Sequence, residues 1–202
     1  MKKLLFLCAI VASFAFIKSG NTITDKERSY AVKLLTDTEN GVFTAVKGLS
    51  DAQLKFKPAP DRWSVEDCLK HIAITEQGLW AMTDAAIKAA ANPEARADIK
   101  ATDEQLVTNI EDRTNKIKTA PQLEPQNTPF KSATEALNSF KENREKLITY
   151  TKSTQDDLRN HVAALPFGKF DSYQMILFIA GHSNRHTQQI EEVKADPNFP
   201  KN

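Results

Sequence analysis

Apolar residues recur at three- and four-residue intervals along most of this chain, which predicts α-helices that each bury one face. We expect four long helices, over residues 24–49, 64–91, 132–153 and 172–195, and a shorter amphipathic helix over residues 103–118. The β-branched and aromatic residues do not alternate usefully with polar ones, which favours helices over strands. Residues 54–62 and 164–168 are expected to be a proline-containing connection and a turn.

Capping signals support the starts of these helices. Thr24 is followed three residues later by Glu27, a pairing typical of a capping box. Ser64 precedes two acidic residues, which suits the first turn of a helix. Ser172 is the expected cap of the last helix. The sequence therefore predicts an all-α protein, a four-helix bundle with one extra short helix.

The N-terminal segment has the organisation of a secretory signal peptide. Lys2 and Lys3 form a basic start, and residues 4–17 are an unbroken run of apolar and small residues. This run is shorter than the roughly 20 residues that cross a bilayer as a helix. We expect residues 1–20 to be removed, leaving residues 21–202 as one secreted or periplasmic helical domain with no stable membrane span. The alternative is an uncleaved segment that anchors the protein to the membrane.

Charge and cysteine content narrow the function classes. The 27 basic residues lose Lys2, Lys3 and Lys18 on cleavage, so 24 remain against 26 acidic ones and the net charge is about −2. Without a basic cluster, the chain has no electrostatic surface for nucleic acid. Cys68 is then the only cysteine, which excludes an intramolecular disulfide. Its place on an apolar stripe favours an inert buried thiol over a nucleophile.

Three histidines form the strongest chemical signal. His182 and His186 lie four residues apart on the last predicted helix, so their imidazoles share a face about one turn, roughly 6 Å, apart. Both continue the apolar stripe of that helix, and His71 lies on the inward stripe of another. Burying them without partners would be costly, which favours a three-histidine divalent metal site with open positions. The alternative is structural or surface histidines; His161, without such companions, is interpreted as ordinary loop polarity.

Several stronger motifs are absent from the sequence. Ser183 stands where a zinc peptidase of the His-Glu-x-x-His type needs its glutamate. No Glu-x-x-His pair occurs, which argues against a carboxylate-bridged di-iron bundle. Neither a glycine-rich phosphate loop nor a nucleophile-elbow serine is present.

Two motifs and the order of the elements between them resemble the DinB-like (DinB/YfiT) family over roughly residues 24–193. The first motif is Pro-Asp-Arg-Trp-Ser-Val at residues 60–65, ahead of the helix that carries His71. The second is the run His-Ser-Asn-Arg-His-Thr-Gln-Gln-Ile at residues 182–190. The resemblance implies an up-down-down-up bundle, often dimeric. It also implies a zinc, nickel or similar divalent ion on three histidines, which His71, His182 and His186 match.

The resemblance also implies candidate functions. Family members include thiol transferases that use low-molecular-weight thiols, and many members have no assigned activity. We expect a metal-dependent hydrolase or transferase that acts on a small unknown substrate through a metal-bound water or thiol. The alternatives are a non-catalytic metal-binding or stress-related bundle and a metal-free interaction bundle. The thiols that these transferases use are cytosolic, so export of the protein argues against the thiol-transferase hypothesis.

Four further residues are candidates for supporting roles. Arg144, on the inward stripe of its helix, is a candidate to orient an anionic substrate, or alternatively a snorkelling or surface arginine. Glu76 and Gln189 lie about one turn from predicted ligands and are candidate hydrogen-bond acceptors for them. Trp63 is expected to be a packing anchor at the start of its helix.

Overall fold

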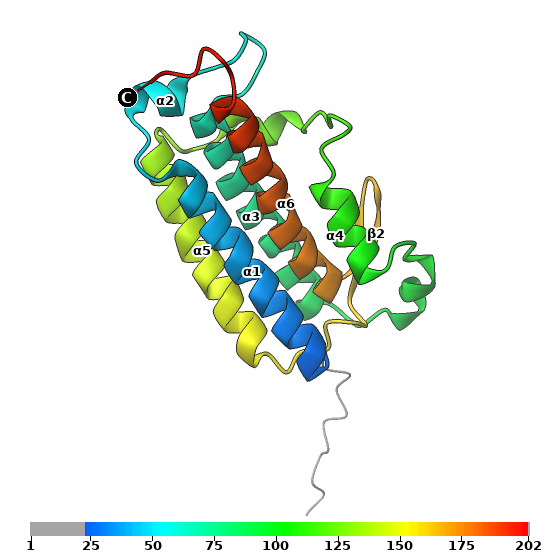
Figure 1. Ribbon diagram of the computed structural model, residues 1–202. Coiled ribbons are helices and arrows are strands. Elements are labelled where there is room, and N and C mark those ends of the chain that lie inside the picture. The colour runs from blue at the N-terminus through cyan, green and yellow to red at the C-terminus, as the bar shows by residue number, and fades with distance from the viewer. Residues whose placement is uncertain (1–22, 202) are drawn as a thin grey trace, which may run out of the picture.

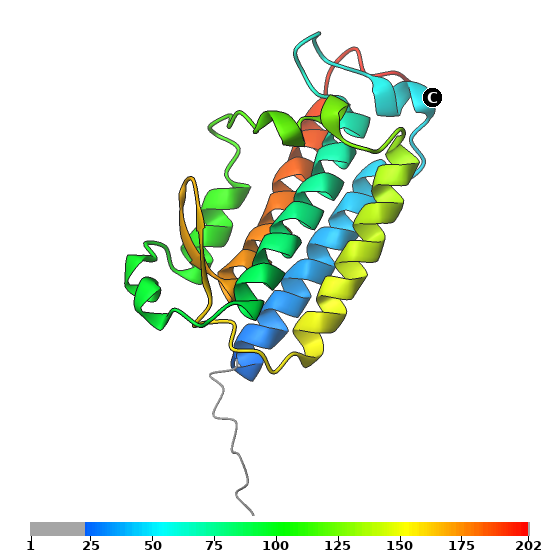
Figure 2. The same ribbon diagram turned by 180° about the vertical axis from the view of Figure 1, so that it is seen from behind.

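Four long helices form the body of the protein in the computed structural model, which describes residues 23–201. They are α1 (Asp25–Val46), α3 (Val65–Lys88), α5 (Ala133–Ser153) and α6 (Ser172–Lys194). Figures 1 and 2 show that α1 and α6 run in one direction and that α3 and α5 run in the other. Taken in chain order, this is the predicted up-down-down-up bundle. The predicted signal peptide, residues 1–20, lies outside the described residues.

Each long helix packs on two neighbours, in the cyclic order α1, α6, α3, α5. The apolar core lies between them in two clusters, one around Leu35, Leu147 and Ile176 and the other around Leu69 and Phe140. Within the described residues, no helix combines the length and the apolar character that a membrane-spanning segment requires.

The caps predicted for the first two long helices form as expected. The Thr24 hydroxyl accepts a hydrogen bond from the Glu27 backbone N–H (3.2 Å), and the Ser64 hydroxyl accepts one from the Asp67 N–H (3.1 Å). The predicted cap of the last helix was wrong by one residue. Asp171 caps α6, and the hydroxyl of Ser172 donates instead to the carbonyl of His161. A carboxylate interacts more strongly than a hydroxyl with the positive end of the helix dipole.

The connections follow from the helix directions. A short segment with the unpredicted helix α2 (Asp51–Lys55) joins α1 to its antiparallel successor α3. Because α3 and α5 run the same way, their connection must return along the whole bundle. It contains the 3₁₀ turns η1 (Pro93–Asp98), η2 (Pro121–Leu123) and η3 (Pro125–Asn127), and the short helix α4 (Asp103–Glu111). This return path packs α4 on α6 and brings η2 and η3 against α3.

The predicted short helix is seven residues shorter than expected, since α4 ends at Glu111 rather than near residue 118. The guanidinium of Arg185, on α6, binds the carbonyl oxygens of Ile110, Asp112 and Asn115, at the end of this helix and just after it. The Asp112 carboxylate also accepts a hydrogen bond from the Thr114 N–H (2.8 Å), a local turn that competes with the helix.

The turn expected at residues 164–168 belongs to a β-hairpin that the sequence did not reveal. Its strands are β1 (Val162–Leu165) and β2 (Gly168–Asp171), paired antiparallel between α5 and α6. Four residues are too few for alternation to stand out. Gly168 adopts a φ of 155°, and a Cβ there would lie 3.1 Å from the ring of Phe170.

Candidate metal centre

The three predicted histidines meet between the antiparallel neighbours α3 and α6. His71 comes from α3, and His182 and His186 come from successive turns of α6. One ring nitrogen from each lies within 4.8 Å of the others. The Nε2 atoms of His71 and His182 are 3.2 Å apart, and the ring of His186 lies 4.5 Å and 4.6 Å, centroid to centroid, from the other two rings. The fold therefore gathers imidazoles that are 111 residues apart in sequence.

Hydrogen bonds orient two of these rings. The Nδ1–H of His71 donates to the carbonyl oxygen of Leu123 in η2 (2.8 Å), and that of His186 donates to Oε1 of Gln189 (2.9 Å). Both partners can only accept, so the proton of each neutral ring is on Nδ1 and the lone pair is on Nε2. Such contacts are the usual support of metal-ligating histidines.

Burial favours the uncharged form of the three rings. His71 and His186 are buried, and His182 is half-buried. Burial lowers the pKa of His71, partly offset by its hydrogen bond to Leu123. Burial first, and then the charges of the neighbouring histidines, hold the pKa values of His182 and His186 well below their ordinary value. Neutral imidazoles are the form that binds a metal ion.

Aromatic rings flank the cluster at both ends. The indole of Trp63 lies 4.8 Å from the ring of His71 and stacks on that of His186 (5.8 Å). Phe178, one turn before His182, stacks on its ring at 6.2 Å, and the hairpin residue Phe167 stacks in turn on Phe178 at 5.6 Å. Trp63 is thus a packing anchor, as predicted, but it packs on the candidate metal ligands themselves.

Of the two residues predicted to accept hydrogen bonds from the histidines, one does so and the other does not. Gln189 contacts a histidine, as expected. Glu76 does not: both of its carboxylate oxygens accept hydrogen bonds from Arg144 (2.8 and 2.7 Å), so this prediction was wrong. His161 lies apart from the cluster and donates from Nδ1 to the carbonyl of Ala86 (2.9 Å).

Arg144 holds the bundle together instead of facing a substrate. Its side chain has no exposed surface. Besides Glu76 on α3, the guanidinium binds the hydroxyl of Thr38 on α1 (2.7 Å) and the hydroxyl of Ser183 on α6 (2.9 Å). The arginine on α5 is therefore bonded to all three other long helices. In this conformation it cannot orient an anionic substrate, because no substrate can reach it.

Two groups at the site were missed by the sequence analysis. The carbonyl of Leu123 has no side-chain signal, and only the return path of the chain brings it to His71. Arg113 falls within the predicted helix of residues 103–118, but in the structure it follows the end of α4. Its guanidinium binds both oxygens of Glu192 (2.6 and 2.8 Å) and lies 3.4 Å from Oε1 of Gln189.

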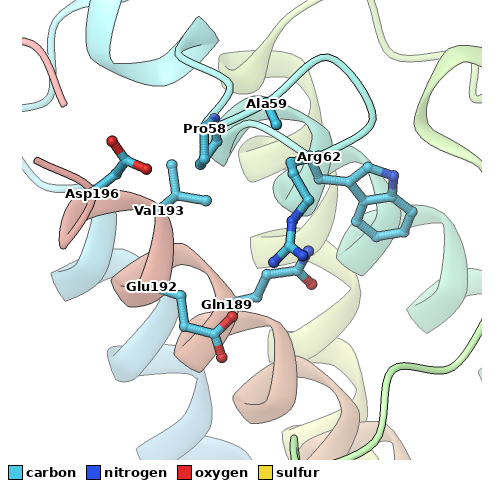
Figure 3. Close-up of a pocket in the computed structure, with 8 residues that line it drawn as sticks. Pro58, Ala59, Arg62, Gln189, Glu192, Val193 and Asp196 are labelled. Carbon is cyan, nitrogen blue, oxygen red and sulfur yellow. The ribbon is translucent and has the colours of Figure 1, made fainter. Parts of the chain in front are cut away.

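A cavity of about 330 Å³ opens beside the cluster. Figure 3 shows it between the segment before α3 and the last turns of α6, lined by Pro58, Ala59, Arg62, Trp63, Gln189, Glu192, Val193 and Asp196. Trp63 and Gln189 belong both to this lining and to the surroundings of the histidines. These two side chains therefore connect the cavity with the histidine cluster.

Comparison with known proteins identifies the family. The sequence model of the DinB superfamily matches residues 34–190, more than three-quarters of the chain. The chain belongs to the DinB superfamily. The chain is also 30% identical over 150 residues to the uncharacterized protein YuaE of Bacillus subtilis (strain 168), a match that covers 74% of this chain and 88% of YuaE.

A solved structure shares the DinB fold described above. YfiT from Bacillus subtilis is described as a probable metal-dependent hydrolase with an unusual four-helix bundle topology. It superposes with a TM-score of 0.59 at 13% sequence identity, over 89% of this chain and 92% of its own. At 13% sequence identity, this similarity shows that the two proteins share a fold.

The residues of this DinB protein fit a divalent metal ion. Three neutral imidazoles converge, and hydrogen bonds at Nδ1 leave Nε2 of His71 and His186 available as ligands. Within residues 23–201, no cysteine, aspartate or glutamate joins the group. A set of three nitrogen ligands is typical of zinc and of similar borderline ions, and leaves coordination positions open.

Proposed function

We propose that this protein is a metal-dependent hydrolase that acts on a small substrate at a zinc or nickel ion held by His71, His182 and His186. The observation that carries the proposal is the convergence of three neutral imidazoles without a fourth protein ligand among the described residues. An ion held in this way keeps its full charge and an open position. The description of YfiT as a probable metal-dependent hydrolase supports the same reaction class.

The residues around the cluster orient two of the imidazoles and shield two sides of the cluster from water. Leu123 and Gln189 fix the rings of His71 and His186 through their Nδ1 protons. Trp63 and Phe178 cover two sides of the cluster with apolar surface, which strengthens electrostatic interactions there. A divalent ion, when bound, supplies Lewis-acid activation of the reacting group.

A non-catalytic metal-binding protein is the second candidate function. Such a protein is expected to close its site with a further ligand and to have no adjacent cavity. The three-histidine set and the cavity beside Trp63 favour the catalytic alternative. A transferase would use the same centre and differ in the acceptor, so thiol acceptors belong in the substrate screen.

Metal content is the first test. The chain from residue 21, prepared without a histidine tag, is expected to carry close to one equivalent of zinc or nickel by elemental mass spectrometry. The His182→Ala/His186→Ala variant is expected to carry almost none. His161→Ala is the matched control and keeps its metal, because His161 lies outside the cluster. Equal metal in all three proteins would reject this site.

Hydrolysis is the second test. The metal-loaded protein is assayed with small esters and amides, alone and with thiol acceptors, and the His182→Ala/His186→Ala variant serves as the inactive reference. Turnover that disappears in this variant and persists in His161→Ala supports the proposal. A fully loaded protein without turnover on any of these compounds would instead favour the non-catalytic function.

Export after cleavage near residue 20 and assembly into a homodimer stay predictions. N-terminal sequencing of the protein recovered from its native compartment tests the first, and light scattering tests the second.

A further inference from the structure

The cavity beside the metal centre contains hydrogen-bond donors that have no acceptor. Oε1 of Gln189 is already engaged, since it accepts from Nδ1 of His186 and faces Arg113. The amide NH₂ of Gln189 therefore remains as a donor. Within residues 23–201, neither this NH₂ nor the guanidinium of Arg62 makes a hydrogen bond or a close ion pair, although the charge of Arg62 helps to lower the pKa of Glu192.

The two donors come from different elements and meet in one place. Arg62 lies in the segment before α3, and Gln189 lies on α6. Both line the same cavity, and Figure 3 shows their polar ends directed toward the same part of it. A guanidinium and an amide NH₂ can both donate to one planar, two-oxygen acceptor.

The charged residues around these donors determine whether a monoanion or a dianion fits the cavity better. Glu192 also lines the cavity, but Arg113 binds both of its oxygens and neutralises it. Asp196 is the remaining carboxylate of the lining, and one of its oxygens accepts a hydrogen bond from the Asn198 N–H. One cation with one nearby anion suits a monoanion better than a dianion.

We propose that Arg62 and the NH₂ of Gln189 form a subsite for the carboxylate of a small molecule, with Trp63, Pro58 and Val193 as its apolar walls. A volume of about 330 Å³ is at the lower end of the range for small-molecule sites, so the ligand is small. Because Gln189 also orients His186, a carboxylate bound here lies directly beside the metal centre. Only the identification of this ligand as the substrate rests on the proposed function.

Three probes of similar size test the subsite by isothermal titration calorimetry on the purified protein. They are phenylacetate, its neutral analogue phenylacetamide, and phenyl phosphate. We expect phenylacetate to bind most tightly. Arg62→Gln is expected to weaken it roughly tenfold to a hundredfold, the usual loss for a hydrogen bond to a charged group, and to leave phenylacetamide unchanged. Arg62→Lys is expected to lie between the two.

Two further variants separate the contributions. Arg96→Gln removes an exposed arginine of η1, outside the cavity lining, and is expected to bind like the parent. Asp196→Asn removes the competing anion and is expected to strengthen phenylacetate binding. Because the Arg62 guanidinium makes no hydrogen bond or close ion pair within residues 23–201, Arg62→Gln is expected to unfold close to the parent temperature.

Three outcomes would overturn the inference. The first is no preference for phenylacetate over phenylacetamide. The second is tighter binding of phenyl phosphate, which would indicate a phosphate site. The third is phenylacetate binding that survives Arg62→Gln and disappears in His182→Ala/His186→Ala, which would show that the carboxylate binds the ion. Absence of hydrolase activity affects none of these readouts, so the two proposals can fail separately.

Discussion

Replacement of Arg144 by methionine tests the interaction that joins the four helices. The side chains of Arg144 and Glu76 are 0% and 2% exposed, so removing the arginine leaves a buried carboxylate without its partner. Loss of one member of a buried ion pair costs about 3–5 kcal/mol of unfolding free energy. For a domain of this size, we expect the melting temperature to fall by roughly 6 to 20 °C.

A double-mutant cycle isolates the pair. Glu76→Leu alone leaves the buried guanidinium of Arg144 without its carboxylate partner and is expected to lower the unfolding free energy by a similar amount. Arg144→Met/Glu76→Leu removes both charges and is expected to cost no more than either single change, because neither leaves a buried charge behind. Urea unfolding followed by circular dichroism measures all four proteins. Additive losses in the double variant would refute the reasoning.

The pH dependence of Arg144→Met provides a second readout. Burial raises the pKa of Glu76, and in the parent Arg144 opposes this effect. Without the arginine, the folded state binds a proton at Glu76 more tightly than the unfolded chain does. The free energy of unfolding of the variant should therefore decrease as pH rises through the raised pKa. Thermal unfolding between pH 5 and 8 should show the variant approaching the parent at the acidic end. A constant difference would contradict the expectation.

Four further outcomes are expected. Gln189→Leu, which removes the acceptor of the His186 Nδ1–H, should weaken zinc binding roughly 10- to 100-fold in a chelator competition, and unchanged affinity would exclude an orienting role. The pKa values of the three clustered histidines are lowered in the folded state, so the unfolded chain takes up protons before the folded chain does as pH falls through about 6.5. The metal-free protein should therefore lose stability in this pH range, which its melting temperature measures. Burial raises the pKa of the Cys68 thiol, so the folded mature chain should not react with a disulfide reagent, whereas the unfolded chain should release one equivalent. Gly168→Ala should destabilise the hairpin by about 1 kcal/mol or more in urea unfolding, because of its φ and the contact with Phe170.

The long helices were predictable because their signals are local. The hydroxyl of Thr24 and the carboxylate of Glu27 pair across three residues, whatever the rest of the chain does. Likewise, the helical repeat alone places His182 and His186 on one face. The length of α4 could not be predicted in this way. Arg185, more than 70 residues away, binds the carbonyls of Ile110 and Asp112 at which that helix ends.

The candidate site shows the same division. The sequence determined which imidazoles are available and that two of them share a helix face. Only the tertiary structure decided that His71 joins them, that the carbonyl of Leu123 orients it, and that the neutral forms prevail in a buried setting. It also gave two arginines different surroundings, since Arg144 is enclosed among four helices whereas Arg62 lines a cavity. The reason is physical: the helical repeat reports which way a side chain points, but its partners, burial and charge state depend on segments that only folding brings together.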